Sequence, residues 1–358
     1  MPSLKEIKGR INSISSTLAI TSAMKMVAAA KLQKAQMAIQ NMLPYERRLY
    51  SMLVDLMGAM NISAAASEDG SVRGSGSAER GFDQSGDLLS LSNRHDLAGM
   101  DGAYSLMAQR EVRKVAIVAF ASNSSLCGAF NSNVIREATA VINEYRASGL
   151  GDADITVYSV GRKMAEAMKK LGFPSPADFT KMSDSPSYDA ASALAQELFD
   201  GFVSGRFDKV ELVYNHYKST SSQPTTRQTY LPLSLADATA DLQAEKITDS
   251  ASETDTNKVA EPVGAPVVRQ GSPTTEDLIV EPSKEALIAT LLPKVIRLRI
   301  FTTLLDSAAA EHAARTVAMQ LATDNGNDLL QELTLEYNKG RQQKITSEIL
   351  DLVGGSMQ

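Results

Sequence analysis

The chain has 358 residues, of which 43% are hydrophobic, and a formal net charge of −6 at pH 7. Aromatic residues make up only 5%, which disfavours a large sandwich or barrel and favours helices rich in Ala, Leu, Met and Lys. The single cysteine, Cys127, excludes an internal disulfide framework and a Cys-only zinc site. We expect no membrane span and no signal peptide, because the apolar runs are short and the N-terminus is polar.

The charge is unevenly distributed along the chain. Residues 1–50 carry eight Lys or Arg against two Glu, a net charge of +6. Residues 235–280 carry three basic against nine acidic residues, a net charge of −6. A basic N-terminal segment fits nucleic acid, an anionic membrane surface or an acidic protein partner.

The first predicted element is one long helix over about residues 3–60, so we assign 1–60 as an N-terminal helical unit. Its apolar residues alternate in steps of three and four, as in a coiled coil: Leu4, Ile7, Ile11, Ile14 and Leu18. Pro44 predicts a kink or a local break. At 1.5 Å per residue the helix is about 85 Å long, longer than a compact domain of this size is wide.

Residues 61–110 are dominated by Ser, Gly, Asp and Arg and form a predicted polar insert. The middle of the chain, 111–235, then alternates between strand and helix patterns. Strands are predicted at 115–120, 155–160, 210–214 and 229–233, with helices at 131–148, 161–171 and 190–204. This order predicts an open, Rossmann-like α/β sheet with an antiparallel hairpin at one edge.

A second, acidic insert is predicted at 236–282, and the last unit, 283–358, is helical again. Pro293 predicts an early break or kink, and from Lys294 to about Val353 no proline intervenes. This helix is about 90 Å long, close to the length of the first. The predicted fold class is therefore α/β plus all-α: a long antiparallel coiled coil of the two terminal helices, with the α/β domain at its base.

One loop, Ala121–Asn131, has the position of a ligand site, at a predicted strand-to-helix turn. It lacks the glycines of a dinucleotide fingerprint and the Lys-Ser/Thr pair of a P-loop. Cys127 lies where a helix dipole activates a thiol, but no histidine forms a recognisable partner motif. His216 and His312 are most simply structural. We predict no catalytic residues, no cofactor site and no metal site.

Two apolar stretches are unusual for an ordinary core. Residues 24–30 place small and flexible apolar groups nearly all round the first helix, which indicates contacts on several sides. The end of the last helix carries Ile349, Leu350, Leu352 and Val353 at a chain terminus. An apolar tip of this kind is unfavourable unless it enters a partner's pocket.

Three motifs in this order resemble the γ subunits of F-type (rotary) ATP synthases. They are Ile7–Ile11 with Ile20–Ala28, then Leu126–Asn131, then Glu311–Arg315 with Tyr337–Ile349 and Gly354-Gly355. The resemblance covers about residues 1–60, 112–235 and 283–358. It implies the same fold, with the coiled coil as a rotor shaft.

The resemblance also implies partners, a role and a location. The shaft stands inside a hexamer of α and β subunits, and the α/β domain binds the ε subunit and the membrane ring of c subunits. Proton flow turns the ring and the shaft, which drives the catalytic β subunits through their states. The chain is then a non-catalytic subunit of a proton-translocating enzyme, without nucleic acid as partner. It lies peripherally at the cytoplasmic face of the bacterial inner membrane.

Residues carry over from the matching motifs. Met24 and Lys25 correspond to the shaft region that faces the mobile lever of the β subunits. Arg341, Gln342 and Thr346 correspond to a catch on a β-subunit loop. The bearing in an apolar sleeve of the hexamer comprises Ile345, Ile349, Leu352 and Val353. The alternatives are a stand-alone α/β enzyme with a substrate site near Ser125 and a coiled-coil adaptor that does not rotate.

Overall fold

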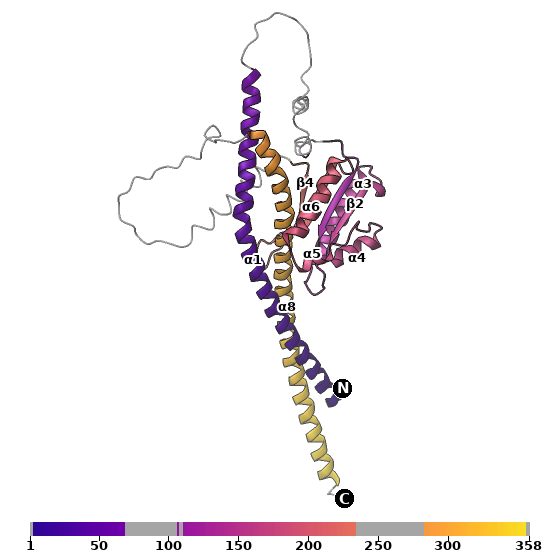
Figure 1. Cartoon of the computed structure of the whole chain (residues 1–358). Helices are drawn as coiled ribbons and strands as arrows, with labels where there is room; N and C mark the ends of the chain where they lie inside the picture. The colour runs from indigo at the N-terminus through magenta and orange to yellow at the C-terminus, as the bar shows by residue number, and fades with distance from the viewer. Residues whose placement is uncertain (1–2, 69–105, 107–109, 234–282, 356–358) are drawn as a thin grey trace, which may run out of the picture.

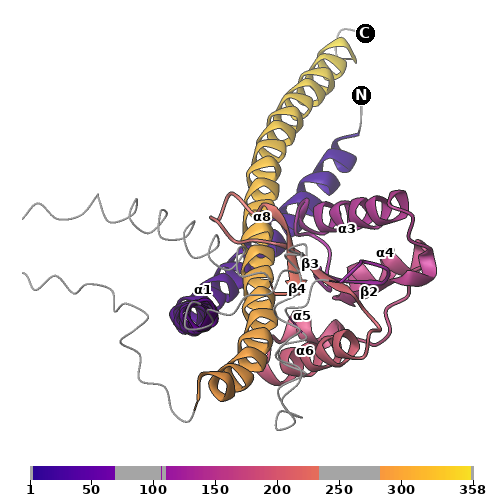
Figure 2. The same ribbon diagram turned by 90° about the horizontal axis from the view of Figure 1, so that it is seen from above.

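The computed structural model describes residues 3–68, 106, 110–233 and 283–355. Two long helices, α1 (Leu4–Glu68) and α8 (Lys284–Gly355), form a rod, and an α/β domain packs against the side of α8 (Figures 1 and 2). This confirms the predicted fold class. Of the predicted inserts, residues 69–105, 107–109 and 236–282 lie outside the described residues.

The two long helices pair antiparallel, and four contacts fix their register. Leu18 packs on Gly326, where an added Cβ would lie 2.6 Å from its Cδ2 atom, and Leu4 packs likewise on Gly340. The two remaining contacts are hydrogen bonds, from Thr323 to Thr21 at 3.3 Å and from Arg299 to Glu46 at 3.1 Å. Glycine lowers helix propensity at both positions but lets the leucine of the facing helix approach closely.

The seam between the helices follows the predicted heptad spacing. On α1, Ile7 is buried, and Leu4, Ile11, Ile14 and Leu18 are half-buried. The covered positions of α8 alternate in steps of four and three: Met319, Thr323, Gly326, Leu330, Leu333, Tyr337 and Gly340. This spacing keeps one stripe of each helix against its partner.

Both long helices exceed the predicted length. Pro44 and Pro293 lie inside α1 and α8 rather than ending them. The residues that follow Pro293, Val295 and Ile296, are 1% and 2% exposed, and this burial offsets the hydrogen bond lost at the proline. With 65 and 72 residues, the helices are about 100 Å and about 110 Å long. Residues 61–68 continue α1 instead of beginning the polar insert, because three alanines there favour helix.

The α/β domain contains one four-stranded sheet in the order β2-β1-β3-β4. Strands β1 (Val115–Phe120), β2 (Ile155–Val160) and β3 (Lys209–Asn215) are parallel, and β4 (Thr225–Leu231) pairs antiparallel with β3. The hairpin at one edge is therefore as predicted, although β4 begins four residues before the predicted strand. The helices are α3 (Phe130–Ala147), α4 (Arg162–Lys170), α5 (Thr180–Asp184) and α6 (Tyr188–Val203), with a 3-10 turn at Asp152–Asp154.

Side chains of β1 alternate between the two faces of the sheet, as a buried parallel strand requires. Val115, Ile117 and Ala119 join the core under α3 and α4. Their neighbours Ala116, Val118 and Phe120 face the larger core formed with α6 and α8, which Leu49, Leu53 and Leu56 of α1 also enter. The sheet is thus fixed directly to the rod (Figure 2). In the described part of the chain, no helix has the length and apolar character that a bilayer crossing requires.

Candidate interaction surface

The first exposed apolar surface lies on α1, one face of which turns away from α8. We call it the α1 patch, and its members are Ile20, Met24, Met26 and Val27, which are 41–66% exposed. Lys25, between the two methionines, is half-buried. Four large apolar side chains on two turns of one helix favour a protein contact over free solvent.

The second surface is the end of α8, which extends past the start of α1. Because Leu4 faces Gly340, residues 341–355 project beyond the start of α1 (Figure 1). We call this segment the α8 tip. All residues from 341 to 350 are exposed, including the predicted bearing residues Ile345 and Ile349 at 48% and 54%. Leu352 and Val353, also in the predicted bearing, are 75% and 52% exposed.

The predicted catch residues Arg341, Gln342 and Thr346 lie at the start of the α8 tip, and all three are exposed. The Thr346 hydroxyl donates a hydrogen bond to the Gln342 carbonyl at 2.9 Å, whereas no described residue pairs with the Arg341 guanidinium. Arg341 is level with the first turn of α1, about 30 Å along the rod from Met24 at 1.5 Å per residue. The structure therefore does not bring the two predicted β-subunit contacts together; they are separate surfaces.

A third feature is the joint between α8 and the β1–α3 loop. Glu311 and Arg315 form an ion pair at 2.7 Å, and Arg315 also donates to the Ser124 hydroxyl at 2.7 Å. Both side chains of the pair are largely buried. Burial raises the pKa of the Glu311 carboxyl above its ordinary value, while the neighbouring Arg315 opposes that shift. The sequence contained both residues in one motif but gave no sign that they tie the loop to the rod.

Leu126, in the same loop, is a candidate contact residue that the sequence analysis did not assign. Its backbone has φ 68°, in the left-handed region that favours glycine, and its side chain is 59% exposed. An exposed leucine with a strained backbone indicates a functional rather than a packing constraint. The only sequence signal was its place in the Leu126–Asn131 motif.

The loop that had the position of a ligand site is closed on itself. The Lys163 amide donates to the Ser122 carbonyl at 3.1 Å, and the Arg162 amide donates to the Asn123 side chain at 2.7 Å. Within the loop, the Ser122 amide and hydroxyl both donate to the Asn131 side-chain oxygen at 3.0 Å. Across the described ranges, no group of His, Cys, Asp and Glu side chains has the arrangement of a metal site.

Cys127 is 1% exposed and packs against Phe130 and Ala310. Its sulfur lies 3.2 Å from Asn131 Nδ2 and 3.7 Å from the Ser122 hydroxyl, and in the described part of the chain no histidine hydrogen-bonds to it. The geometry matches a small buried side chain rather than an activated nucleophile.

The resemblance implies a rotary ATPase complex, and we expect Cys127→Ser to leave the turnover of that complex near its unmodified value. The free energy of unfolding should fall by about 1 kcal/mol, because serine nearly conserves the volume and meets polar neighbours. Turnover assays and denaturant unfolding measure the two effects. Loss of turnover in a variant that folds and assembles would contradict a structural role for this thiol.

His312 of α8 is a half-buried group whose titration predicts a pH effect on stability. Its Nδ1 atom has no hydrogen-bond partner among the described residues. Burial, with the positive charges of Arg315 and Lys31, lowers the pKa of His312 from 6.5 to about 4. Between these values the unfolded chain binds a proton that the folded chain does not, so the stability of the fold falls as the pH falls from 6.5 toward 4.

We expect His312→Gln to flatten this pH dependence, since glutamine does not titrate. Between pH 7 and pH 5 the histidine should contribute on the order of 1 kcal/mol, a figure reduced for its partial exposure. Denaturant unfolding of both proteins at the two pH values provides the measurement. Equal slopes of stability against pH would show that His312 is not the responsible group.

Fold and surfaces together define a class: a coiled-coil shaft protein with an attached α/β domain and an exposed helical tip. A family model described as ATP synthase matches residues 3–357. The ATP synthase gamma chain of Phocaeicola vulgatus is 48% identical over 357 residues, and that of Bacteroides thetaiotaomicron is 45% identical over 358. Each alignment covers 100% of both chains. The chain belongs to the family of ATP synthase γ chains, which makes it a subunit of an enzyme complex.

The fold is also similar to that of a solved structure. A chain of the cryo-EM structure of Euglena gracilis mitochondrial ATP synthase (OSCP/F1/c-ring, rotational state 3) superposes with a TM-score of 0.53. The match covers 99% of this chain and 93% of that chain at 18% identity. The likeness concerns the fold, including the long helical pair.

Proposed function

We propose that this chain is the central rotor shaft of a rotary ATP synthase, coupling proton-driven rotation of a c-ring to conformational change in catalytic β subunits. The exposed apolar residues of the α8 tip carry this proposal. A single exposed helix with Ile345, Ile349, Leu352 and Val353 on its surface suits rotation in an apolar sleeve formed by an α/β hexamer.

A two-helix shaft has a physical means of coupling. Its cross-section has no three-fold symmetry, so at each rotor angle it presents a different surface to each of three β subunits. A partner's conformational equilibrium shifts only by the difference in its contact free energy between two states. As an asymmetric shaft turns, it changes the contact free energy of each β subunit one after another. Because this coupling acts in both directions, conformational changes of the β subunits drive the shaft during hydrolysis.

We assign two contact regions to the β subunits. Met24 and Lys25 in and beside the α1 patch would meet the mobile lever, where the basic character of α1 favours acidic segments over nucleic acid. About 30 Å further along the rod, Arg341, Gln342 and Thr346 would hold a β-subunit loop. The distance between the two regions along the rod supports two separate contacts with the β subunits rather than a single site.

The α/β domain would bind the ε subunit and the c-ring, and the Arg315–Ser124 joint would transmit torque to α8. The chain itself would be non-catalytic. The β1–α3 loop supports this, because its polar groups pair with one another and with α4. Its place would be peripheral, at the cytoplasmic face of a bacterial inner membrane, through the complex.

One experiment separates the alternatives. The full-length chain is expressed with α and β subunits of the same source, purified by a tag on β and observed for rotation of a bead attached to the α/β domain. We expect co-purification, ATPase activity and rotation driven by ATP. Turnover by the chain alone would favour the α/β enzyme, and an active complex without rotation would favour the static adaptor.

A further inference from the structure

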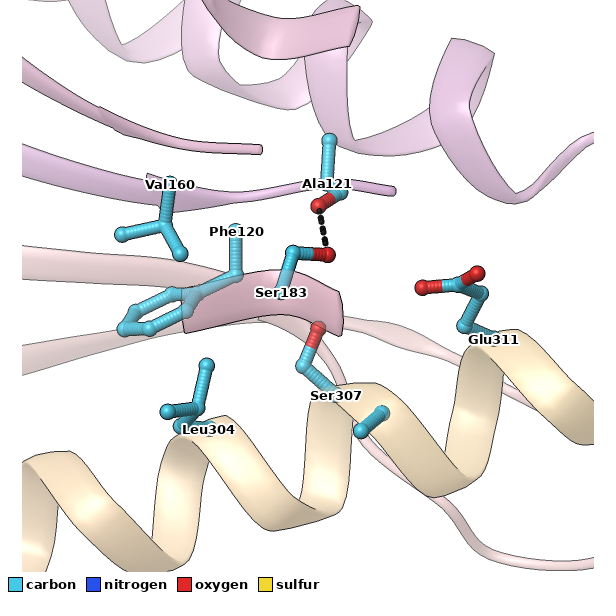
Figure 3. A pocket seen from close by; sticks show the side chains of 8 residues that line it. Phe120, Ala121, Val160, Ser183, Leu304, Ser307 and Glu311 are labelled. Atoms are coloured by element: carbon cyan, nitrogen blue, oxygen red, sulfur yellow. Dashed lines mark hydrogen bonds between the residues drawn. The ribbon is translucent and has the colours of Figure 1, made fainter. Parts of the chain in front are cut away.

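A small cavity lies between α8 and the carboxyl ends of β1 and β2 (Figure 3). It leaves about 10 Å³ for the centre of a water molecule. On the sheet side the walls are formed by Phe120, Ala121 and Val160, and on the helical side by Ser183, Ser307 and Glu311 among others. Space of this size holds a single water.

Two oxygens at the cavity have hydrogen-bonding capacity that no described residue uses. Ser307 is 5% exposed, and its hydroxyl, which points from α8 toward Ser183, makes no hydrogen bond to the described residues (Figure 3). Glu311 is 7% exposed, and its Oε1 atom accepts from Arg315 while Oε2 accepts from no described residue. Native proteins usually satisfy such groups with protein partners or ordered water.

The remaining polar atoms at the cavity are acceptors with spare capacity. The Ser183 hydroxyl donates to the Ala121 carbonyl at 3.0 Å, and both of these oxygens retain a free lone pair. A ligand of this cavity must donate one hydrogen bond to the Glu311 carboxylate and one to the Ser183 hydroxyl or the Ala121 carbonyl. It must also accept a hydrogen bond from the Ser307 hydroxyl. Water does all three, which is the usual number of hydrogen bonds for a buried water.

A cation fits the same cavity less well. The charge of Glu311 is already balanced by Arg315 at 2.7 Å. Sodium or potassium would also need more oxygen ligands than the three or four groups present. Electroneutrality and the small volume both favour a neutral ligand.

We propose that this cavity is a binding site for one water molecule that bridges Ser307 and Glu311 of α8 to the end of strand β1. The water joins the rod to the sheet beside the Arg315–Ser124 joint and completes the hydrogen bonding of both buried side chains. The inference concerns groups of this chain alone, so it does not depend on the proposed rotor function or on any partner.

A high-resolution structure of the assembled complex, containing the full chain, tests the proposal. We expect a single density peak at about 2.7–3.2 Å from the Ser307 hydroxyl and the Glu311 carboxylate. Ser307→Ala should remove the peak or reduce its occupancy. In the matched control Thr303→Val the peak should remain, because the buried Thr303 hydroxyl donates to the Arg299 carbonyl of its own helix at 2.8 Å.

Three results would overturn the proposal. An empty cavity in the unmodified protein would show that Ser307 is satisfied in another way. A peak with four or more oxygens at about 2.4 Å would identify a cation instead. An unchanged peak in Ser307→Ala would remove Ser307 as the anchor of the water.

Discussion

We expect Gly161→Ala to lower the free energy of unfolding by about 3–5 kcal/mol, among the largest effects of any single substitution in this chain. Gly161 follows strand β2 with φ +96°, and an added Cβ would lie 2.0 Å from the Ala121 carbonyl oxygen. That oxygen belongs to the backbone after β1, so it cannot rotate aside as a side chain can. Removing this steric clash would require the loops after β1 and β2 to move apart.

Gly172 provides a matched control for this effect. It lies at the other end of α4 with φ +92°, but an added Cβ would meet nothing within 4 Å. Gly172→Ala should therefore cost only the backbone strain, about 1–2 kcal/mol. Denaturant unfolding of both variants provides the comparison, and equal losses would show that the contact with Ala121 is not decisive.

We expect Arg341→Lys to lower the ATP turnover of the assembled complex about tenfold, equivalent to about 1.4 kcal/mol. A guanidinium makes two parallel hydrogen bonds to a carboxylate, and an ammonium does not reproduce that geometry. Because Arg341 is exposed and no described residue pairs with it, the stability of the fold should change by less than about 0.5 kcal/mol.

Arg136→Lys is the control for this substitution. Arg136 lies exposed on α3 of the α/β domain and hydrogen-bonds to Asn133 of the same helix. Its replacement should leave turnover unchanged. Equal turnover of Arg341→Lys and the unmodified complex would contradict the assignment of Arg341 to a catch, and a large loss of stability would show a structural role instead.

Local pattern predicted much of the architecture. The alternating spacing from Leu4 to Leu18 predicted the coiled-coil seam, and the apolar run Val115–Phe120 predicted the central strand with its observed bounds. Both predictions rest on apolar residues that recur every few positions, because one side of a helix or strand is buried against the rest of the protein. The short helix α5 carries no comparable repeat, and it was missed.

The two prolines show how far local pattern reaches. Each predicted a kink or a break, and the structure shows that Pro44 lies inside α1 and Pro293 inside α8. Propensity describes an isolated segment, whereas the observed helix is stabilised by what it packs against.

The sequence by itself determined two long amphipathic helices, an open sheet between them and an apolar tip, because each depends on a periodicity within one segment. Tertiary structure alone decided the pairing of Leu18 with Gly326 and the joint of Arg315 with Ser124. It also placed Glu211, 1% exposed in a strand, between Arg227 and the Tyr145 hydroxyl. These partners lie 16 to 308 residues apart in the sequence. Polar groups that folding removes from water need a hydrogen-bond partner, and the packing of the helices on the sheet determines which groups lie close enough to provide one.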